Sequence, residues 1–255
     1  MIKFFDVLNQ DKLFHKKLIK DISILLNRND FILGKKVFEF EKKFAKFCNT
    51  KYAISCANGT DALTISLKIL NLPKDSEVII PAMTYCSTAF SVINANLKPI
   101  LVDLKYNEPV ADLNQIIKKI SKKTKVIIPV HLYGSAFDIK KLKNHIKKKR
   151  IYIIDDCSQA HGCKDDRMLK IGSLADISCF SLYPGKNLGA YGDAGIITTK
   201  NKNFYEKIRN FRNLGSTKKF EHTQIGFNSR LDTIQALVLL YKLKYLIKNN
   251  IKRTN

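Results

Sequence analysis

One lysine is distinguished by the sequence around it. From Ile171 to Thr199 the only basic residue is Lys186, although 45 of the 255 residues are lysine or arginine. Composition alone would place about five basic residues in a segment of this length. Burial lowers the pKa of a lysine because desolvation disfavours the ammonium form, and the neutral amine can form a Schiff base with an aldehyde. The alternative is a lone lysine in a glycine-rich surface turn.

A possible partner for such an amine follows another apolar run. The segment IYIIDDCSQAHG contains Asp155 and Asp156 at the end of a predicted strand, with Gln159 three residues after the second aspartate. A pyridine cofactor acts as an electron sink while its ring nitrogen stays protonated, which requires a carboxylate. In a first helical turn, Gln159 could reach the same ligand as Asp156. The alternative is that one of the aspartates only caps a turn.

Other segments supply groups for a phosphate and an aromatic ring. Gly59 and Thr60 lie between a predicted strand and a helix, where backbone amides and a hydroxyl meet the positive helix end. Ser181 is a second hydroxyl candidate, and Tyr85 could lie flat on a pyridine ring. The plain alternatives are a helix cap formed by Thr60 or Asp61 and a core position for Tyr85.

Several other kinds of site are excluded by the sequence. A phosphate-binding P-loop ending at Lys186 would need glycine at Phe180 and a hydroxyl at Asn187. No GxGxxG motif follows a predicted strand, which argues against a dinucleotide site. The six cysteines contain no CxxC pair, so we expect neither a metal site nor a disulfide framework.

These residues lie in a chain whose short β-branched runs alternate with amphipathic segments. That rhythm predicts an α/β fold with a mostly parallel sheet flanked by helices, and ligands gather at the carboxyl ends of such strands. The predicted strands are Tyr52–Cys56, Glu77–Ile80, Pro99–Asp103, Lys125–His131, Ile151–Asp155, Ile177–Leu182 and Gly195–Thr199. The predicted helices are 11–28, 36–47, 60–71, 84–95, 112–120, 138–149 and 231–251. We expect Leu237, Leu240 and Leu243 of the last helix to be exposed, which would favour aggregation or a missing partner.

The composition is that of a soluble globular protein, with 45% hydrophobic and 26% charged residues. No apolar run approaches the roughly 20 residues that span a bilayer, and the amino-terminal sequence lacks a signal peptide, so we expect a cytoplasmic location without membrane association. The net charge of +23 comes mostly from lysines spread over predicted helix faces, such as Lys118, Lys119, Lys122, Lys123 and Lys125. Without interleaved aromatic residues or a nucleic-acid module, these lysines favour a solvated surface over specific nucleic-acid binding.

The motifs NGTDAL, PAMTY, IIDDCSQAHG, SLYPGKNLGAYGDAG and GFNSRLDTIQA occur in order along the chain. Together they resemble the DegT/DnrJ/EryC1/StrS family of sugar aminotransferases, which use pyridoxal 5′-phosphate and have the fold-type I, aspartate aminotransferase-like architecture. The resemblance implies that Lys186 carries the cofactor, Asp156 pairs with its pyridine nitrogen, Gln159 bonds its phenolic oxygen, Tyr85 stacks on the ring, and Gly59, Thr60 and Ser181 hold the phosphate. It further implies a homodimer in which Asn228 reaches the neighbouring subunit's phosphate.

The resemblance also implies a reaction. The PGKNLG context is similar to enzymes that aminate C3 of a dTDP-3-keto-6-deoxyhexose with L-glutamate as donor, and Tyr183 is then a sugar contact. Relatives that dehydrate C3 carry histidine in place of the lysine, so Lys186 argues against that reaction. Asp155 stands where relatives usually have glutamate, and Cys157-Ser158 replaces a small apolar pair.

The resemblance predicts the domain organisation as well. Residues 1–255 would form the cofactor-binding large domain, with helices in about 1–50 and the start of a long connecting helix at about 231–255. Family members continue into a small carboxyl-terminal domain, which we expect to be absent here. Two alternatives to an active aminotransferase stay open: a truncated, inactive remnant, and a non-catalytic binding or regulatory protein that retains the fold.

Overall fold

The computed structural model describes residues 12–218 and 220–254, and its centre is a seven-stranded sheet in the order β1-β7-β6-β5-β4-β2-β3. The neighbours from β6 through β5, β4 and β2 to β3 are parallel, while β7 runs antiparallel to both β6 and β1. The strands are β1 Tyr52–Cys56, β2 Glu77–Pro81, β3 Lys98–Val102, β4 Thr124–Ile127, β5 Tyr152–Asp156, β6 Ile177–Ser181 and β7 Gly195–Thr199. The predicted, mostly parallel α/β sheet is therefore confirmed.

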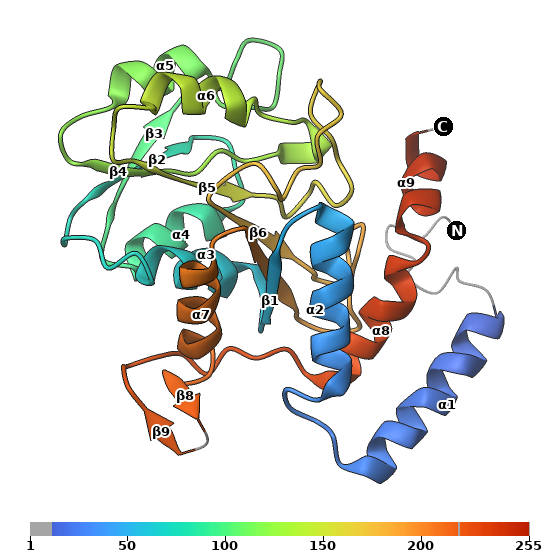
Figure 1. The fold of residues 1–255 in the computed structure, drawn as a ribbon. Helices are drawn as coiled ribbons and strands as arrows, with labels where there is room; N and C mark the ends of the chain where they lie inside the picture. The colour runs from blue at the N-terminus through green and yellow to red at the C-terminus, as the bar shows by residue number, and fades with distance from the viewer. Residues whose placement is uncertain (1–11, 219, 255) are drawn as a thin grey trace.

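Helices cover both faces of this sheet (Figure 1). They are α1 Lys12–Arg28, α2 Lys35–Cys48, α3 Gly59–Lys68, α4 Cys86–Asn94, α5 Leu113–Lys119, α6 Ile139–Ile146, α7 Lys202–Phe211, α8 Thr233–Leu243 and α9 Leu246–Thr254. Residues of α3 and α7 share one apolar cluster with β1, β2 and β4–β7, whereas α5 and α6 share another with the opposite face of β2–β5. A third cluster joins α2 and α8 to β6 and β7.

The two faces arise from the alternation of side chains along each strand. In β5, Ile153 packs in the cluster of α5 and α6, and its neighbour Ile154 packs in the cluster of α3. In β6, Phe180 packs in the cluster of α2 and α8, and its neighbour Cys179 packs in the cluster of α3. With apolar residues on both faces, the strands become buried and their carboxyl ends are left as the positions where polar side chains can gather.

The main differences from the prediction concern β4, the last helix and the segment after β7. β4 ends at Ile127, because Pro129 has no N–H with which to continue the ladder. The predicted last helix is two helices, α8 and α9, separated at Lys244 and Tyr245. Helix α7 and the hairpin of β8 (Ser216–Lys218) and β9 (Glu221–His222) were not predicted. The predicted start of the first helix, at residue 11, lies outside the described residues.

The expected exposure of the last helix was wrong. Leu237 is 2% exposed and Leu240 is 5% exposed. Leu240 belongs to the cluster that joins α2 and α8 to the sheet, and Leu243 is partly buried against that cluster. Helix α8 is covered by α2 on one side and by α1 on the other, where Phe14 packs near Leu237. Among the described residues, no helix is long and apolar enough to cross a membrane.

Candidate active site

A cavity of about 480 Å³ lies at the carboxyl ends of the parallel strands. Eight of the nine predicted site residues line it: Gly59, Thr60, Tyr85, Asp156, Gln159, Ser181, Tyr183 and Lys186. The ninth, Asn228, is exposed and forms an isolated bridge with Asn213 instead. Its predicted role in a neighbouring subunit stays a prediction.

Lys186 lies in a tight loop after β6. Its backbone N–H donates to the carbonyl of Tyr183 at 2.9 Å. At Gly189, a Cβ would come within 2.4 Å of the Pro184 carbonyl oxygen, so the loop can close only around a glycine. The Lys186 side chain is half-buried, and desolvation lowers its pKa while the charge of Asp156 acts in the opposite direction. The lysine is therefore part of a cavity wall rather than an exposed turn.

Asp156 is the last residue of β5 and is 5% exposed. Its Oδ2 accepts a hydrogen bond from the hydroxyl of Thr88 at 2.9 Å, and its Oδ1 accepts one from the backbone N–H of Ser158 at 3.0 Å. The second bond is the turn cap that the alternative interpretation anticipated. The same carboxylate also lines the cavity, so capping the turn does not remove it from the candidate site, and the two bonds fix the orientation of the acid.

Gln159 is oriented by an unusual backbone segment. Its Oε1 accepts a hydrogen bond from the N–H of Tyr133 at 2.9 Å, and Tyr133 adopts a left-handed conformation with φ of 54°. This contact uses the acceptor end of the amide and leaves the Nε2 donor for a ligand. Gln159 can therefore donate to an anionic oxygen, as the resemblance implied.

The phosphate end of the cavity is the start of α3. Asn58 caps this helix by accepting from the N–H of Asp61 at 2.8 Å, so the predicted alternative of a cap by Thr60 or Asp61 was wrong. A Cβ on Gly59 would meet the Ser181 Cβ at 2.6 Å, which shows how closely the helix approaches β6. With these amides and hydroxyls at a positive helix end, the site fits a phosphate.

Two solvent-exposed tyrosines line the cavity. Tyr85 is 68% exposed and precedes α4, and Tyr183 is 55% exposed in the lysine loop. The alternative of a core position for Tyr85 is therefore wrong. An exposed aromatic side chain at the cavity leaves its ring face available for stacking on a planar ligand.

Sequence reasoning missed five polar residues of this region. Ser87 accepts a hydrogen bond from the Thr60 hydroxyl at 2.7 Å, and Ser158 accepts one from the Ser181 N–H at 3.2 Å. The missed set is Thr84, Ser87, Thr88, Ser158 and Asp193, of which all but Thr88 line the cavity. Their only sequence signal is position: Thr84, Ser158 and Asp193 lie within the motifs, and Ser87 and Thr88 follow PAMTY closely.

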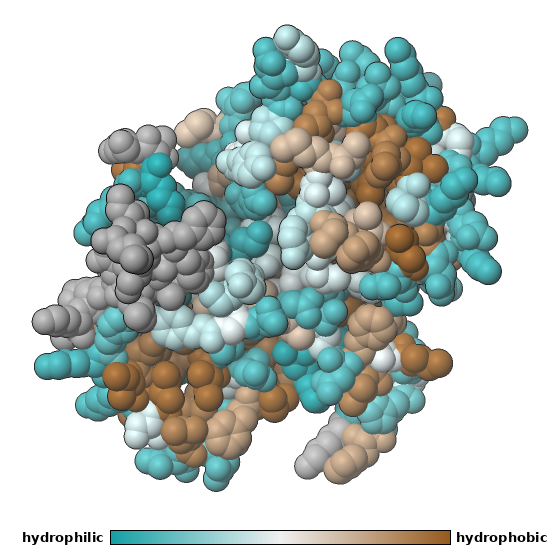
Figure 2. Space-filling view, turned by 180° about the vertical axis from the view of Figure 1, so that it is seen from behind, coloured by the Kyte–Doolittle hydropathy of each residue, from teal (hydrophilic) through white to brown (hydrophobic). Residues whose placement is uncertain are grey.

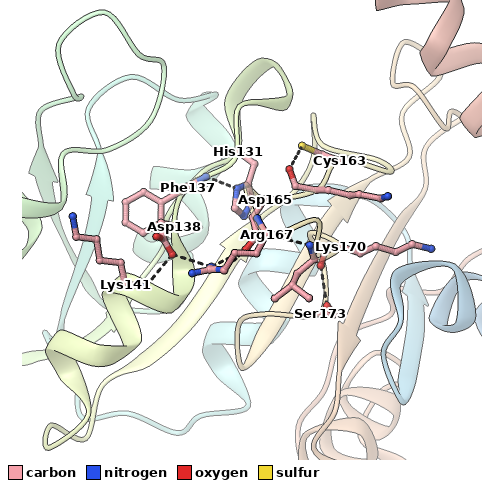
Figure 3. Close-up of polar contacts among 11 residues, drawn as sticks. His131, Phe137, Asp138, Lys141, Cys163, Asp165, Arg167, Lys170 and Ser173 are labelled. Atoms are coloured by element: carbon pink, nitrogen blue, oxygen red, sulfur yellow. Dashed lines mark hydrogen bonds and ion pairs between the residues drawn. The ribbon is translucent and has the colours of Figure 1, made fainter.

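Behind the site, Asp155 points to the opposite side of β5 from Asp156. Its Oδ2 lies 3.2 Å from the Nε2 of His131. The His131 Nδ1 accepts a hydrogen bond from the N–H of Phe137 (Figure 3). His131 therefore carries its proton on Nε2. Cys157 completes a buried group within 4.8 Å, but burial raises the pKa of its thiol well above the usual value, so the protonated thiol is a poor metal ligand.

The carboxylate of Asp165 stabilises the loop that follows the Asp156 segment. Asp165 accepts hydrogen bonds from the N–H groups of Arg167 and Leu169 and forms an ion pair with the Arg167 guanidinium at 2.6 Å. Arg167 also bonds at 3.0 Å to Asp138, which caps α6 (Figure 3). The loop after the Asp156 segment is thereby fastened to α6.

Comparison with known proteins gives relatives over nearly the whole chain. A protein of Aneurinibacillus thermoaerophilus named dTDP-3-amino-3,6-dideoxy-alpha-D-galactopyranose transaminase is 40% identical over 99% of this chain and 69% of its own. A UDP-2-acetamido-2-deoxy-3-oxo-D-glucuronate aminotransferase of Pseudomonas aeruginosa is 38% identical over 96% of this chain and 68% of its own. Other curated relatives are matched over 61% to 63% of their length.

Solved structures agree with this result. S. venezuelae DesV in complex with a ketimine intermediate superimposes with a TM-score of 0.93 and 33% identity, over 97% of this chain and 66% of that one. NtdA from Bacillus subtilis with bound cofactor PMP gives a TM-score of 0.89 and 30% identity, over 96% and 56%. The fold is thus that of the pyridoxal phosphate-dependent aminotransferases.

The family can be stated more narrowly. The family model described as the DegT/DnrJ/EryC1/StrS aminotransferase family matches residues 13–255. This chain belongs to that family, and pyridoxal 5′-phosphate is the cofactor that its cavity residues fit.

Proposed function

We propose that this chain is the cofactor-binding domain of an aminotransferase that converts a nucleotide-linked keto-sugar into an amino sugar. The observation that carries the proposal is the placement of Lys186 and Asp156 in one cavity at the sheet edge. A half-buried amine and a fixed carboxylate are the two protein groups that pyridoxal phosphate chemistry requires. The named activities of the relatives support the same reaction.

Each residue has a distinct task in this proposal. When bound, pyridoxal phosphate supplies an electron sink for the carbon that carries the nitrogen. Asp156 keeps a proton on the pyridine nitrogen, and Gln159 donates a hydrogen bond to the phenolic oxygen. The Lys186 amine, whose pKa is lowered by burial, takes up a proton at Nζ and gives it back during the transfer.

For the substrate, we propose a dTDP-3-keto-6-deoxyhexose with L-glutamate as the amino donor. The relative with 40% identity is named for a dTDP-3-amino sugar, which supports this choice over a UDP-sugar. Tyr183 is exposed in the lysine loop and lines the cavity, so it is placed to contact the sugar. The PGKNLG context of the loop supports amination at C3.

We further propose a homodimer in which Asn228 completes the partner's phosphate site. Asn228 is exposed and lies outside its own cavity, as a residue that serves a second subunit must. Four exposed apolar side chains of α4, β3 and the loop before α4, Met83, Phe90, Ile93 and Leu101, supply surface for such an interface. Figure 2 shows hydrophobic side chains gathered in several areas of the molecule's rear face.

The experiment is a paired substrate assay. We expect dTDP-3-keto-6-deoxyhexose and L-glutamate to give 2-oxoglutarate and the 3-amino sugar, detected by mass spectrometry, with slower conversion of the 4-keto isomer or a UDP-3-keto sugar. A faster reaction with the UDP-sugar would change the proposed nucleotide from dTDP to UDP but would support the proposed amination. No amine transfer with any keto-sugar, while pyridoxal phosphate binds, would contradict the function and favour the inactive or regulatory alternative.

A further inference from the structure

The positive charge of the chain is concentrated in one segment. Residues 118–150 contain twelve basic residues and one acidic residue, Asp138, which is a net +11 of the chain's +23. The basic residues are Lys118, Lys119, Lys122, Lys123, Lys125, Lys140, Lys141, Lys143, Lys147, Lys148, Lys149 and Arg150. Nearly half of the net charge therefore comes from about an eighth of the sequence.

The fold gathers these residues on one side. They belong to α5, α6, the start of β4 and the turns after the two helices, and α5 and α6 lie side by side at the top of Figure 1. Ile116 of α5 and Leu142 of α6 are buried in the same cluster, so the cationic faces of both helices turn outward. We call the area formed by the side chains of these twelve basic residues the basic surface.

Its charges are largely uncompensated. Ten of the twelve side chains are exposed, and Lys125 and Lys143 are half-buried. Within the described part of the chain, only Lys143 of this set has an ion pair, with Asp176 at 3.9 Å. Since like charges in close proximity raise the free energy of the surface, an anionic partner would lower it.

A groove of about 480 Å³ lies within the basic surface. It is lined by Ile120, Ser121, Lys122, Thr124, Lys125, Lys149, Arg150 and Ile151. Four of these residues are cationic and none is acidic, although the neighbouring Glu77 accepts hydrogen bonds from Ser121 and Thr124. The groove lies at the amino ends of β4 and β5, the opposite edge of the sheet from the Lys186 cavity, so occupation of one site leaves the other open.

We propose that the basic surface binds the headgroups of anionic phospholipids at a membrane surface. Eleven of its twelve cations are lysine, and residues 118–127 and 139–151 contain no Phe, Tyr or Trp. Single-stranded nucleic-acid sites combine cations with aromatic residues on which the bases stack, and base-specific contacts favour arginine. Adsorption to an anionic bilayer needs only clustered cations, each contributing about 1 kcal/mol near the surface. The proposal is independent of the amination chemistry and replaces the expectation of a merely solvated surface.

The mode of binding also follows from the fold. The apolar residues of α6, among them Ile139 and Ile146, are already buried against the sheet. The helix therefore has no apolar face to insert into lipid, and the contact is electrostatic. Such binding weakens with ionic strength, because the Debye length falls from about 8 Å at physiological salt to about 3 Å at 1 M.

The test is co-sedimentation with vesicles of phosphatidylcholine alone and of phosphatidylcholine mixed with phosphatidylglycerol. The surface variant carries Lys122→Gln, Lys123→Gln, Lys148→Gln and Lys149→Gln. The control variant loses the same charge elsewhere, through Lys42→Gln, Lys46→Gln, Lys200→Gln and Lys207→Gln, all at exposed positions. Circular dichroism and thermal unfolding check that both variants fold.

We expect binding to the anionic vesicles only, reversed by high salt. Because four lysines at about 1 kcal/mol each are removed, the surface variant should bind roughly a thousand-fold more weakly, and the control variant less than about threefold more weakly. Equal losses in both variants would overturn the proposal, because net charge alone would then account for binding. So would equal binding to neutral vesicles, or retention by a single-stranded RNA without retention by anionic vesicles.

Discussion

At the residue scale, two polar side chains of the candidate site, those of Asp156 and Gln159, are held by neighbours that have no direct role in the proposed chemistry. Thr88 and the Ser158 N–H fix the two oxygens of Asp156, and the Tyr133 N–H fixes Gln159. Both bonds hold the Asp156 carboxylate in one orientation. In the proposed function, the ring nitrogen of the cofactor would therefore meet a carboxylate whose position is set before the cofactor binds.

Thr88→Val tests this arrangement. Valine keeps the shape of the side chain but removes the 2.9 Å hydrogen bond to Asp156. Since bonds to charged groups contribute about 1.5–3 kcal/mol, we expect pyridoxal phosphate to bind about tenfold more weakly, measured by absorbance titration. Thr198→Val is the matched control, because it removes a buried hydroxyl that bonds to the Gly172 carbonyl instead. Equal affinities of the two variants would refute the role of Thr88.

His161 gives a prediction about acid stability. It is 1% exposed, donates from Nε2 to the Ser181 carbonyl at 2.9 Å, and has a pKa lowered to about 3 by burial. Between pH 6.5 and 3 the unfolded chain binds a proton at this histidine that the folded chain does not, so stability must fall as pH falls.

The measurement compares the wild type with His161→Gln, whose amide can still donate to Ser181. We expect the wild type to lose up to about 1.4 kcal/mol per pH unit through this group below pH 6.5. The variant lacks this contribution, so its free energy of unfolding in urea should depend less steeply on pH. Parallel slopes in the two proteins would show that His161 titrates normally in the folded state.

At the element scale, helix α8 holds the lysine loop in place. Gln235 accepts from the N–H of Tyr191 at 2.8 Å, and Lys242 donates to the carbonyl of Gly189 at 2.7 Å. The Lys242 ammonium also lies 4.2 Å from the centroid of the Tyr191 ring. The loop that carries Lys186 is therefore positioned by a helix from a different part of the sequence.

Lys242 makes the contact between α8 and the lysine loop sensitive to pH. Burial lowers the pKa of Lys242 to about 8, while the unfolded chain keeps its proton until about pH 10.5. Between these values the unfolded state binds more protons, so this group raises the free energy of unfolding as pH rises from 8 to 10. We expect Lys242→Met to lack that rise when both proteins are unfolded by urea across this range. A rise of equal size in the variant would contradict the assignment.

The elements were predictable to different degrees for physical reasons. The strands up to β7 were found because apolar, β-branched runs are a local signal, and β7 matched its predicted bounds. The early end of β4 depends on Pro129. Burial of Leu237 depends on α1 and burial of Leu240 depends on α2, and both helices are distant from α8 in sequence. Lys186 and Asp156 could be found from their local segments, whereas Thr88 is functional only because the fold places it beside Asp156.

At the scale of the whole molecule, a buried polar network joins distant parts of the chain. Arg212 is 2% exposed and follows α7, and its guanidinium lies 2.5 Å from the carboxylate of Glu41 in α2 and 2.5 Å from the carbonyl of Ser55 in β1. Glu41 also accepts from the N–H and the hydroxyl of Ser55. One residue thus connects both faces of the sheet.

Arg212→Leu should destabilise the whole fold. It leaves the Glu41 carboxylate buried without its cation, and breaking a buried pair in this way costs about 3–5 kcal/mol. The urea midpoint should fall accordingly, while exposed Arg209→Leu on α7 should change the free energy of unfolding by less than about 0.5 kcal/mol. Similar stabilities of the two variants would show that the network is not important for folding.

The most direct test of the account is the covalent attachment of the cofactor. The protein is incubated with pyridoxal phosphate, reduced with borohydride and digested, and the modified peptide is identified by mass spectrometry, with Lys186→Ala as the paired variant. We expect the label on Lys186 alone, no label in the variant, and loss of the label when glutamate is added before reduction. Labelling spread over surface lysines, or equal labelling of the Lys186→Ala variant, would contradict the assignment of the active site.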